Sequence, residues 1–167
     1  WATPSTFNGK LDNSVVERFA NKVKRYQNTC SGLVQEIEKG NFRGIETRKI
    51  LENALFPMLE QKIDAVVLGC THYSFVIPLI KEIVGPDINV IDPAPAVARQ
   101  TARILSEWNN PVDDFNDNRI FLITSGQKQK FEKFISLIAI ENYEIFQANW
   151  SLDKREINIV QNKNDHP

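Results

Sequence analysis

A cysteine and a histidine two positions apart, Cys70 and His72, carry the clearest chemical signal in this sequence. They directly follow the apolar stretch at residues 65–69, so the thiol stands at the end of a strand-like run and not within it. A thiol beside an imidazole can act as a nucleophile, a redox group or an acid–base group. The redox role is the weakest, because the other cysteine, Cys30, lies forty residues earlier. The pair alone does not choose between the remaining two roles, and a single cysteine in an apolar strand is most often a small packed side chain.

The segments around this pair predict a chain in which strands and helices alternate. Apolar, β-favouring runs predict strands at 64–70, 88–92, 119–126 and 143–150. Apolar residues at helical spacing predict helices at 12–27, 33–39, 46–61, 73–85, 94–108 and 127–140. Pro57 predicts a kink or a break in the third of these helices. The alternation predicts an α/β fold with mainly parallel sheets flanked by helices, in which ligands bind at the carboxyl ends of strands, where Cys70 and His72 stand.

Composition and charge narrow the class of protein. The 167 residues, 42% of them hydrophobic, suffice for one domain or parts of two. Twenty basic and 21 acidic residues give a net charge of −1, which predicts neither a nucleic-acid partner nor a membrane-binding patch. No run approaches the roughly eighteen apolar residues that a membrane span needs. The two cysteines lie too far apart in sequence for a CxxC motif, which argues against a zinc site or a disulfide framework and favours a reducing, cytoplasmic location.

The segment "LGCTHY" resembles the second catalytic-cysteine motif of glutamate racemases, which belong to a family of cofactor-independent amino-acid racemases. Other segments resemble motifs of the same family in the same order, and they are "ATPSTF", "TCSGLVQEIEKG", "VIDPAPAVARQ" and "RIFLITSGQKQKFEKF". The resemblance extends from residue 1 to about residue 149. His72 points to glutamate as substrate, because related aspartate racemases carry a glutamate at that position. The chain departs from the family at Ser31 and Ser74, where proline is usual, and at Pro93, where serine is usual.

The resemblance implies a role for each of several residues. Cys70 would be one thiol base, His72 would assist its proton state, and Glu38 would support this acid–base network. The implied substrate-binding residues are three threonines, Thr3, Thr6 and Thr71. Without the resemblance these threonines and Glu38 are ordinary polar residues, and Glu36 is as good a candidate as Glu38. Cys30 falls outside the reactive pair and is predicted to be a packed thiol, and neither a cofactor nor a metal is expected.

The resemblance also implies a two-domain fold whose domains face each other over the substrate. Residues 1–93 would form most of the second domain, residues 94–150 the returning part of the first, and residues 151–167 a polar tail. The family's first catalytic cysteine, in an Asn-Thr-bearing motif, has no counterpart in this sequence. We therefore expect an N-terminally incomplete chain that does not racemise glutamate by itself. In the intact enzyme we expect two-thiol proton transfer between L- and D-glutamate, which supplies D-glutamate for peptidoglycan in the cell wall, and the family allows a homodimer.

Two other functions compete with racemisation. The first is a non-catalytic module, or degenerate paralogue, that binds glutamate or another small carboxylate. Replacing Cys70 by serine would abolish turnover in a racemase and leave simple binding intact. The second is a hydrolase or amidotransferase with a thiol nucleophile, which would form a covalent acyl adduct on Cys70 that a proton-transferring thiol does not form.

Overall fold

The computed structural model describes residues 1, 10–108, 120–138, 140–151, 153 and 156–160. The chain divides into two compact units, Trp1–Asn110 and Pro111–Pro167. The last helix of the first unit, α6 (Ala94–Glu107), groups with the residues before it. The division predicted at residue 93 rests on how full-length racemases are built, and it stays a prediction.

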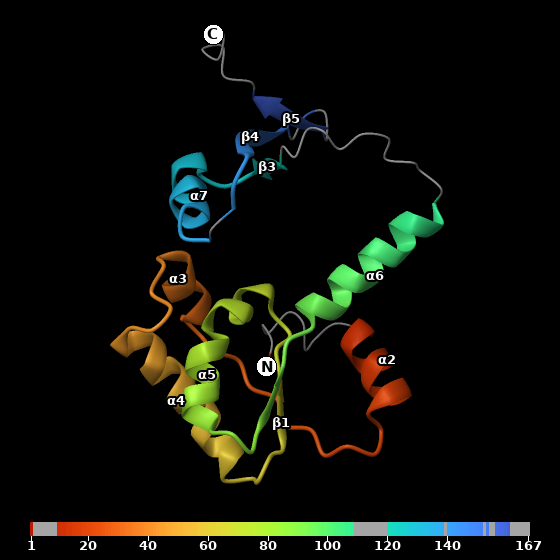
Figure 1. The fold of residues 1–167 in the computed structure, drawn as a ribbon, viewed down its shortest axis with the longest axis vertical. Coiled ribbons are helices and arrows are strands. Elements are labelled where there is room, and N and C mark those ends of the chain that lie inside the picture. The colour runs from red at the N-terminus through yellow and green to blue at the C-terminus, as the bar shows by residue number, and fades with distance from the viewer. Residues whose placement is uncertain (2–9, 109–119, 139, 152, 154–155, 161–167) are drawn as a thin grey trace. The chain divides into compact units, whose positions relative to one another are not determined.

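The first unit places a short parallel sheet among helices (Figure 1). Its other elements, in chain order, are α2 (Lys10–Phe19), α3 (Leu33–Glu38), α4 (Ile45–Leu59), β1 (Ala65–Val67), the 3₁₀ helix η1 (Thr71–Val76), α5 (Ile77–Val84) and β2 (Asn89–Ile91). Strands β1 and β2 pair in parallel, with Val66 opposite Val90. Trp1 lies along the other side of β1, because its amine donates to the Val67 carbonyl at 2.7 Å.

The core of the first unit forms where α3, α4, α5 and η1 pack together. Helix α4 buries Leu51, Leu55 and Met58, which are spaced four and three residues apart and so share one face. Helix α3 buries Leu33 and Ile37 in the same way. Each such leucine or isoleucine contributes about 1.5–3 kcal/mol through the apolar surface it removes from water. This packing holds α3 against η1, the element that carries His72.

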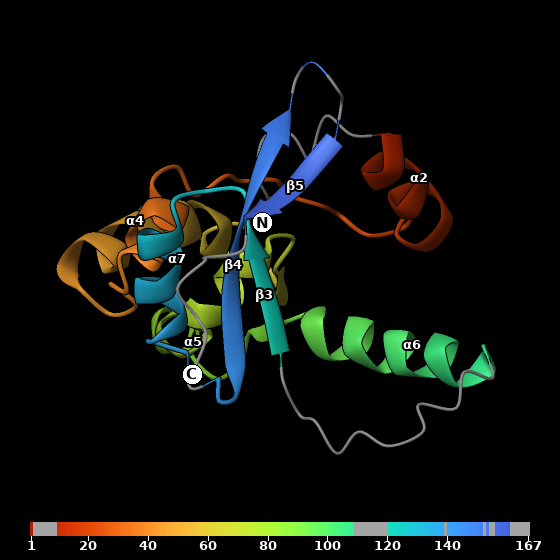
Figure 2. The same cartoon turned by 90° about the horizontal axis from the view of Figure 1, so that it is seen from above.

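The second unit is a three-stranded sheet with one described helix. Strands β3 (Ile120–Thr124) and β4 (Tyr143–Ser151) pair in parallel, and β5 (Glu156–Val160) pairs with β4 in the antiparallel sense. Helix α7 (Lys128–Ile135) connects the parallel pair and packs on β4 with Ile135 buried (Figure 2). The parallel β–α–β connection is the pattern predicted for this region.

The predicted α/β class is confirmed, and several elements differ from the prediction. The helix predicted at 73–85 is divided into η1 and α5, and β1 covers only three residues of the strand predicted at 64–70. Helix α2 ends at Phe19, well before residue 27. None of the described side chains at residues 14–20 is buried, so little packing supports further turns. Pro57 does not break α4, which continues to Leu59 because the buried Leu55 and Met58 on either side hold the last turn in the core. Residues 156–160 form β5 inside the segment predicted as a polar tail, because the alternating sequence "EINIV" pairs with β4.

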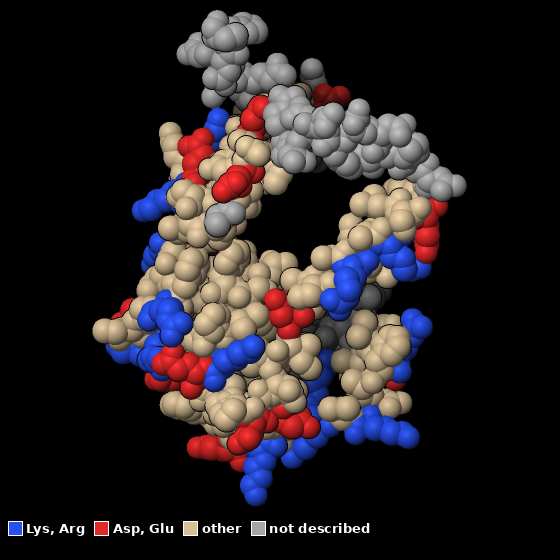
Figure 3. Space-filling view, in the orientation of Figure 1, with Lys and Arg blue, Asp and Glu red and all other residues tan. Residues whose placement is uncertain are grey.

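The described surface mixes charges of both signs. Basic and acidic side chains are interspersed on the face that Figure 3 shows. Ion pairs join some of them, such as Arg43 with Glu82 at 2.8 Å and Lys39 with Glu36 at 2.7 Å. Among the helices that the structure describes, none is both long and apolar enough to cross a membrane.

Candidate active site

Cys70 lies beyond the carboxyl end of strand β1, three residues after Val67 and directly before η1. Side chains alternate along this strand and its extension, with Val66 and Leu68 buried and Val67 exposed. Cys70 continues the inward-facing row but stands where the strand ends, so its thiol is only partly buried. Its backbone is extended, with φ −141° and ψ 131°, and η1 begins at the next residue. This is the position at which parallel α/β sheets present ligand-binding groups.

The structure brings together the three residues that were predicted to be catalytic. Cys70 Sγ lies 4.0 Å from His72 Nδ1, and His72 Nε2 lies 3.2 Å from Glu38 Oε1. An ionised carboxylate can only accept hydrogen bonds, so Nε2–H donates to Glu38. The other ring nitrogen, Nδ1, therefore faces the thiol, where it can accept a proton when the ring is neutral or donate one when the ring is charged. The arrangement is a thiol–imidazole–carboxylate row.

The geometry distinguishes Glu38 from Glu36, which the sequence could not do. Glu36 accepts hydrogen bonds from Lys39 Nζ and Asn41 Nδ2, each at 2.7 Å. These bonds to Lys39 and Asn41 hold the pKa of the Glu36 carboxyl below its usual value. Glu36 therefore fixes the turn after α3, whereas Glu38 faces His72.

The structure describes only one of the three threonines that were predicted to bind substrate. Thr71 is the first residue of η1 and is exposed beside Cys70, so its hydroxyl is accessible to a ligand. Thr3 and Thr6 lie outside the described residues. Their predicted contacts with a substrate stay predictions.

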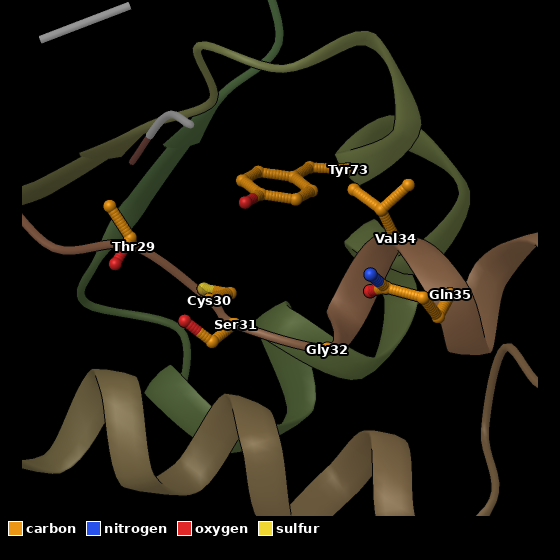
Figure 4. A pocket seen from close by; sticks show the side chains of 7 residues that line it. All are labelled: Thr29, Cys30, Ser31, Gly32, Val34, Gln35 and Tyr73. Carbon is orange, nitrogen blue, oxygen red and sulfur yellow. The ribbon is translucent and has the colours of Figure 1, made fainter. Parts of the chain in front are cut away.

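A pocket of about 160 Å³ lies between the segment before α3 and η1, and Tyr73 forms one of its walls (Figure 4). The lining residues are Thr29, Cys30, Ser31, Gly32, Val34, Gln35 and Tyr73. The Tyr73 hydroxyl points toward the Thr29–Cys30 segment in Figure 4. Sequence analysis missed Tyr73, and the available signal was its spacing of three from the buried Val76 in a 3₁₀ helix.

The second cysteine of the chain is held neutral. Cys30 is 5% exposed, and burial raises the pKa of its thiol from 9.0 to about 12. Burial likewise raises the pKa of Tyr73, its hydrogen-bonded neighbour, to about 12, with further contributions from Cys30 and Cys70. Cys30 is thus a packed thiol, as predicted, and it is a poor proton acceptor at neutral pH.

A hydrogen-bonded bridge joins η1, which follows β1, to the residue that follows β2. Ser74 Oγ donates to Asp92 Oδ1 at 3.0 Å, and the Ala94 N–H donates to the same oxygen at 3.0 Å. Asp92 directly follows β2, so the parallel pairing places it beside the segment that follows β1. Asp92 therefore fastens η1 to the first turn of α6.

Comparison with known proteins assigns the chain to a family. The family model for Asp/Glu/Hydantoin racemase matches residues 2–101, which is more than half of the sequence. This chain belongs to the Asp/Glu/hydantoin racemase family. Among curated members, it is 47% identical over 105 residues to the glutamate racemase of Pseudomonas paraeruginosa, covering 63% of this chain and 40% of that protein. It is 34% identical over 154 residues to the glutamate racemase of Roseiflexus, covering 91% of this chain and 56% of that protein.

Solved racemase structures share the fold. The glutamate racemase of Bacillus anthracis matches with a TM-score of 0.74 at 22% identity, covering 86% of this chain and 54% of that one. The Francisella tularensis enzyme, crystallised with D-glutamate, matches with a TM-score of 0.68 at 24% identity over 92% of this chain and 57% of that one. The predicted racemase-like α/β fold is confirmed. The chain spans about half the length of the relatives and structures that it matches.

Proposed function

We propose that the intact protein interconverts L- and D-glutamate by proton transfer without a cofactor. The observation that carries this proposal is the row Cys70–His72–Glu38 at the end of β1, in a chain of the racemase family. The names of the curated relatives support glutamate as the substrate, as do the solved structures with D-glutamate and L-glutamate bound.

Inversion at the α-carbon needs one base on each face of the substrate. The Cys70 thiolate takes the α-proton, the C–H bond breaks, and its electron pair is delocalised into the neighbouring carboxylate. A second group then delivers a proton to the opposite face, which forms the mirror-image amino acid. In the reverse direction the Cys70 thiol is the donor, so the same residue acts as base or acid according to the enantiomer bound.

The neighbours of Cys70 set its proton state and hold the substrate. His72 Nδ1 faces the thiol and can accept its proton, which leaves a thiolate beside an imidazolium. Glu38 orients the ring through Nε2 and stabilises its positive charge. Thr71 would bind a substrate carboxylate through its exposed hydroxyl, and Thr3 and Thr6 would contact the substrate. Donors of this kind stabilise the charge that develops on the carboxylate as the proton leaves.

The opposing base is not the other cysteine of this chain. Cys30 is buried, and its pKa of about 12 keeps the thiol protonated at neutral pH. We therefore place the second thiol in the part of the full-length racemases that this chain does not span. The 167-residue chain alone is expected to show no net inversion of glutamate.

The remaining parts of the proposal concern the cell. The product D-glutamate would serve peptidoglycan synthesis, which places the enzyme in the cytoplasm. We propose no metal and no nucleic-acid or membrane partner. A homodimer is compatible with the family and is left as a prediction.

The deciding experiment compares Cys70→Ser with Cys30→Ala in the intact protein. L-Glutamate is incubated in D₂O, inversion is followed by circular dichroism, and exchange at the α-carbon is followed by NMR. The parent and Cys30→Ala should both invert glutamate, and Cys70→Ser should lose inversion by about 10²- to 10⁴-fold, the usual contribution of a positioned acid–base group.

Each rival function gives a different result in the same samples. Glutamate binding by the parent without inversion or exchange would identify a binding module. A stable mass increase on Cys70 after incubation with a carboxyl or amide substrate would identify a thiol nucleophile. Unchanged inversion in Cys70→Ser would remove Cys70 from the mechanism.

A further inference from the structure

The 3₁₀ helix η1 presents His72 and Phe75 on one side. A 3₁₀ helix repeats every three residues, so residues three apart in η1 lie above one another. Residues 38–42, which comprise the end of α3 and the turn after it, contact this side of η1 at two points. Glu38 Oε1 lies 3.2 Å from His72 Nε2, and the Phe42 ring stacks on the Phe75 ring with centroids 5.7 Å apart and planes 15° apart.

We propose that Phe42 is a positioning residue for the acid–base row. Its stack on Phe75 would fix the turn after α3 against η1, which keeps Glu38 on His72. The effect on catalysis rests on the proposed function, whereas the coupling between the stack and the His72–Glu38 contact does not.

The His72–Glu38 contact needs such support because it is not enclosed. The Glu38 side chain is 59% exposed and the His72 side chain is 31% exposed. Exposed ion pairs are weak, since water screens the charges and a long side chain loses freedom when it is held in one rotamer. An aromatic stack between half-buried rings is less sensitive to water and adds a preferred orientation. A second contact between the same two segments therefore decides whether Glu38 stays in reach of the imidazole.

The turn that carries Phe42 is itself well anchored. The Asn41 N–H donates to the Glu36 carbonyl at 2.9 Å, and the Asn41 side chain donates to the Glu36 carboxylate at 2.7 Å. The fully buried Thr47 donates its hydroxyl to the Asn41 carbonyl. Because these bonds restrain the residue before it, Phe42 can restrain η1.

The other two sides of η1 are also held by neighbouring elements, so the Phe42 contact completes the support of the helix on its third side. Tyr73 and Val76, three residues apart, are 1% and 0% exposed and fill the core. Ser74 is bonded to Asp92. With all three sides held, η1 keeps a single orientation for the imidazole.

The test is a double-mutant cycle on the 167-residue chain. The imidazole resonance of His72, assigned with His72→Gln, is measured at one pH in the parent, Glu38→Gln, Phe42→Ala and the double variant. Cys70 alkylation rates are measured in the same four proteins. Glu38→Gln should shift the resonance and change the rate in the parent, and both responses should fall at least about twofold in the Phe42→Ala background, because coupled residues are not additive.

Three further variants keep the result decisive. Phe42→Tyr should restore the full response to Glu38→Gln, since it keeps the stacked ring. Phe42→Leu should also reduce the response to Glu38→Gln. Leucine still fills the site with apolar volume, so this variant keeps the test valid if the alanine variant unfolds. Phe56→Ala, on an exposed phenylalanine of α4, should leave the response unchanged. A full response in both Phe42→Ala and Phe42→Leu, or an equal loss in Phe56→Ala, would overturn the proposal.

Kinetics of the intact protein then test the catalytic consequence. Phe42→Ala should lower kcat about 10- to 100-fold with a smaller change in KM, the range expected when a catalytic group is displaced by about an ångström. Absence of racemase activity in the parent would refute the proposed function and leave the coupling result standing. A reduced response to Glu38→Gln in the Phe42→Ala background, together with an unchanged kcat, would show that the stack positions Glu38 without serving catalysis, which would overturn the catalytic part.

Discussion

The buried thiol of Cys30 makes the stability of this chain sensitive to alkaline pH in a way that one substitution should remove. In the unfolded chain a cysteine ionises near its ordinary pKa of 9.0, whereas in the folded chain burial raises the pKa of Cys30 to about 12. The folded state therefore keeps a proton between these values that the unfolded state loses. The stabilisation is complete below pH 9 and is lost as the pH rises toward 12.

The size of the effect follows from linkage. A difference of one bound proton changes the free energy of unfolding by about 1.4 kcal/mol per pH unit. Because the unfolded thiol is only half ionised at pH 9, Cys30 alone should lower stability by about 1 kcal/mol between pH 9 and 10, and by up to about 4 kcal/mol over its full range. Tyr73, whose pKa rises from 10.0 to about 12 through burial, adds a similar slope above pH 10.

Urea unfolding between pH 8 and 10 measures this slope in three proteins. The parent should lose stability above pH 9, and Cys30→Ala should lose about 1 kcal/mol less than the parent between pH 9 and 10. Val34→Ala is the matched control, because Val34 lines the same pocket and carries no ionisable group. It should lower stability at every pH and keep the slope of the parent.

The result bears directly on the mechanism. If Cys30→Ala keeps the slope of the parent, the Cys30 thiol is not held neutral by the fold. Cys30 would then return as a candidate for the opposing base, and the argument that the second thiol lies elsewhere would fail.

Two further predictions concern the supports of the site. Gly44→Ala should destabilise the chain by about 1 kcal/mol, because a Cβ there would displace the Asn41 side chain and break its hydrogen bond to Glu36. Thermal unfolding checks this, and Gly126→Ala, whose Cβ would meet an ordinary contact at 3.4 Å, should be near neutral. Ser74→Ala should lower the free energy of unfolding in urea by about 1 kcal/mol, because it removes one of the two hydrogen bonds to Asp92. Ser106→Ala is the control, since its hydroxyl bonds only within its own helix. Equal losses in the two variants would contradict a stabilising role for the Ser74–Asp92 bond.

Much of the fold could be predicted because its signals are local. The helical spacing of Leu51, Leu55 and Met58 predicts a buried face on α4, and the structure has it. The run before Cys70 predicts a strand at 64–70, and the structure has a shorter one, Ala65–Val67, that ends three residues before the thiol. Local signals also explain the errors. The helix predicted through residue 27 has the right spacing in sequence, but spacing does not fix where a helix ends, and a short helix with little packing is marginal.

The sequence by itself determined the family, the pair Cys70 and His72, and the strand end on which they stand. It could not choose between Glu36 and Glu38, because the partner of His72 lies 34 residues away and either carboxylate fits a helix surface. Only the packing of α3 against η1 turned Glu38 toward the imidazole and left Glu36 to the turn. Burial likewise decided the state of Cys30, since a thiol's pKa depends on the surroundings that the tertiary structure provides.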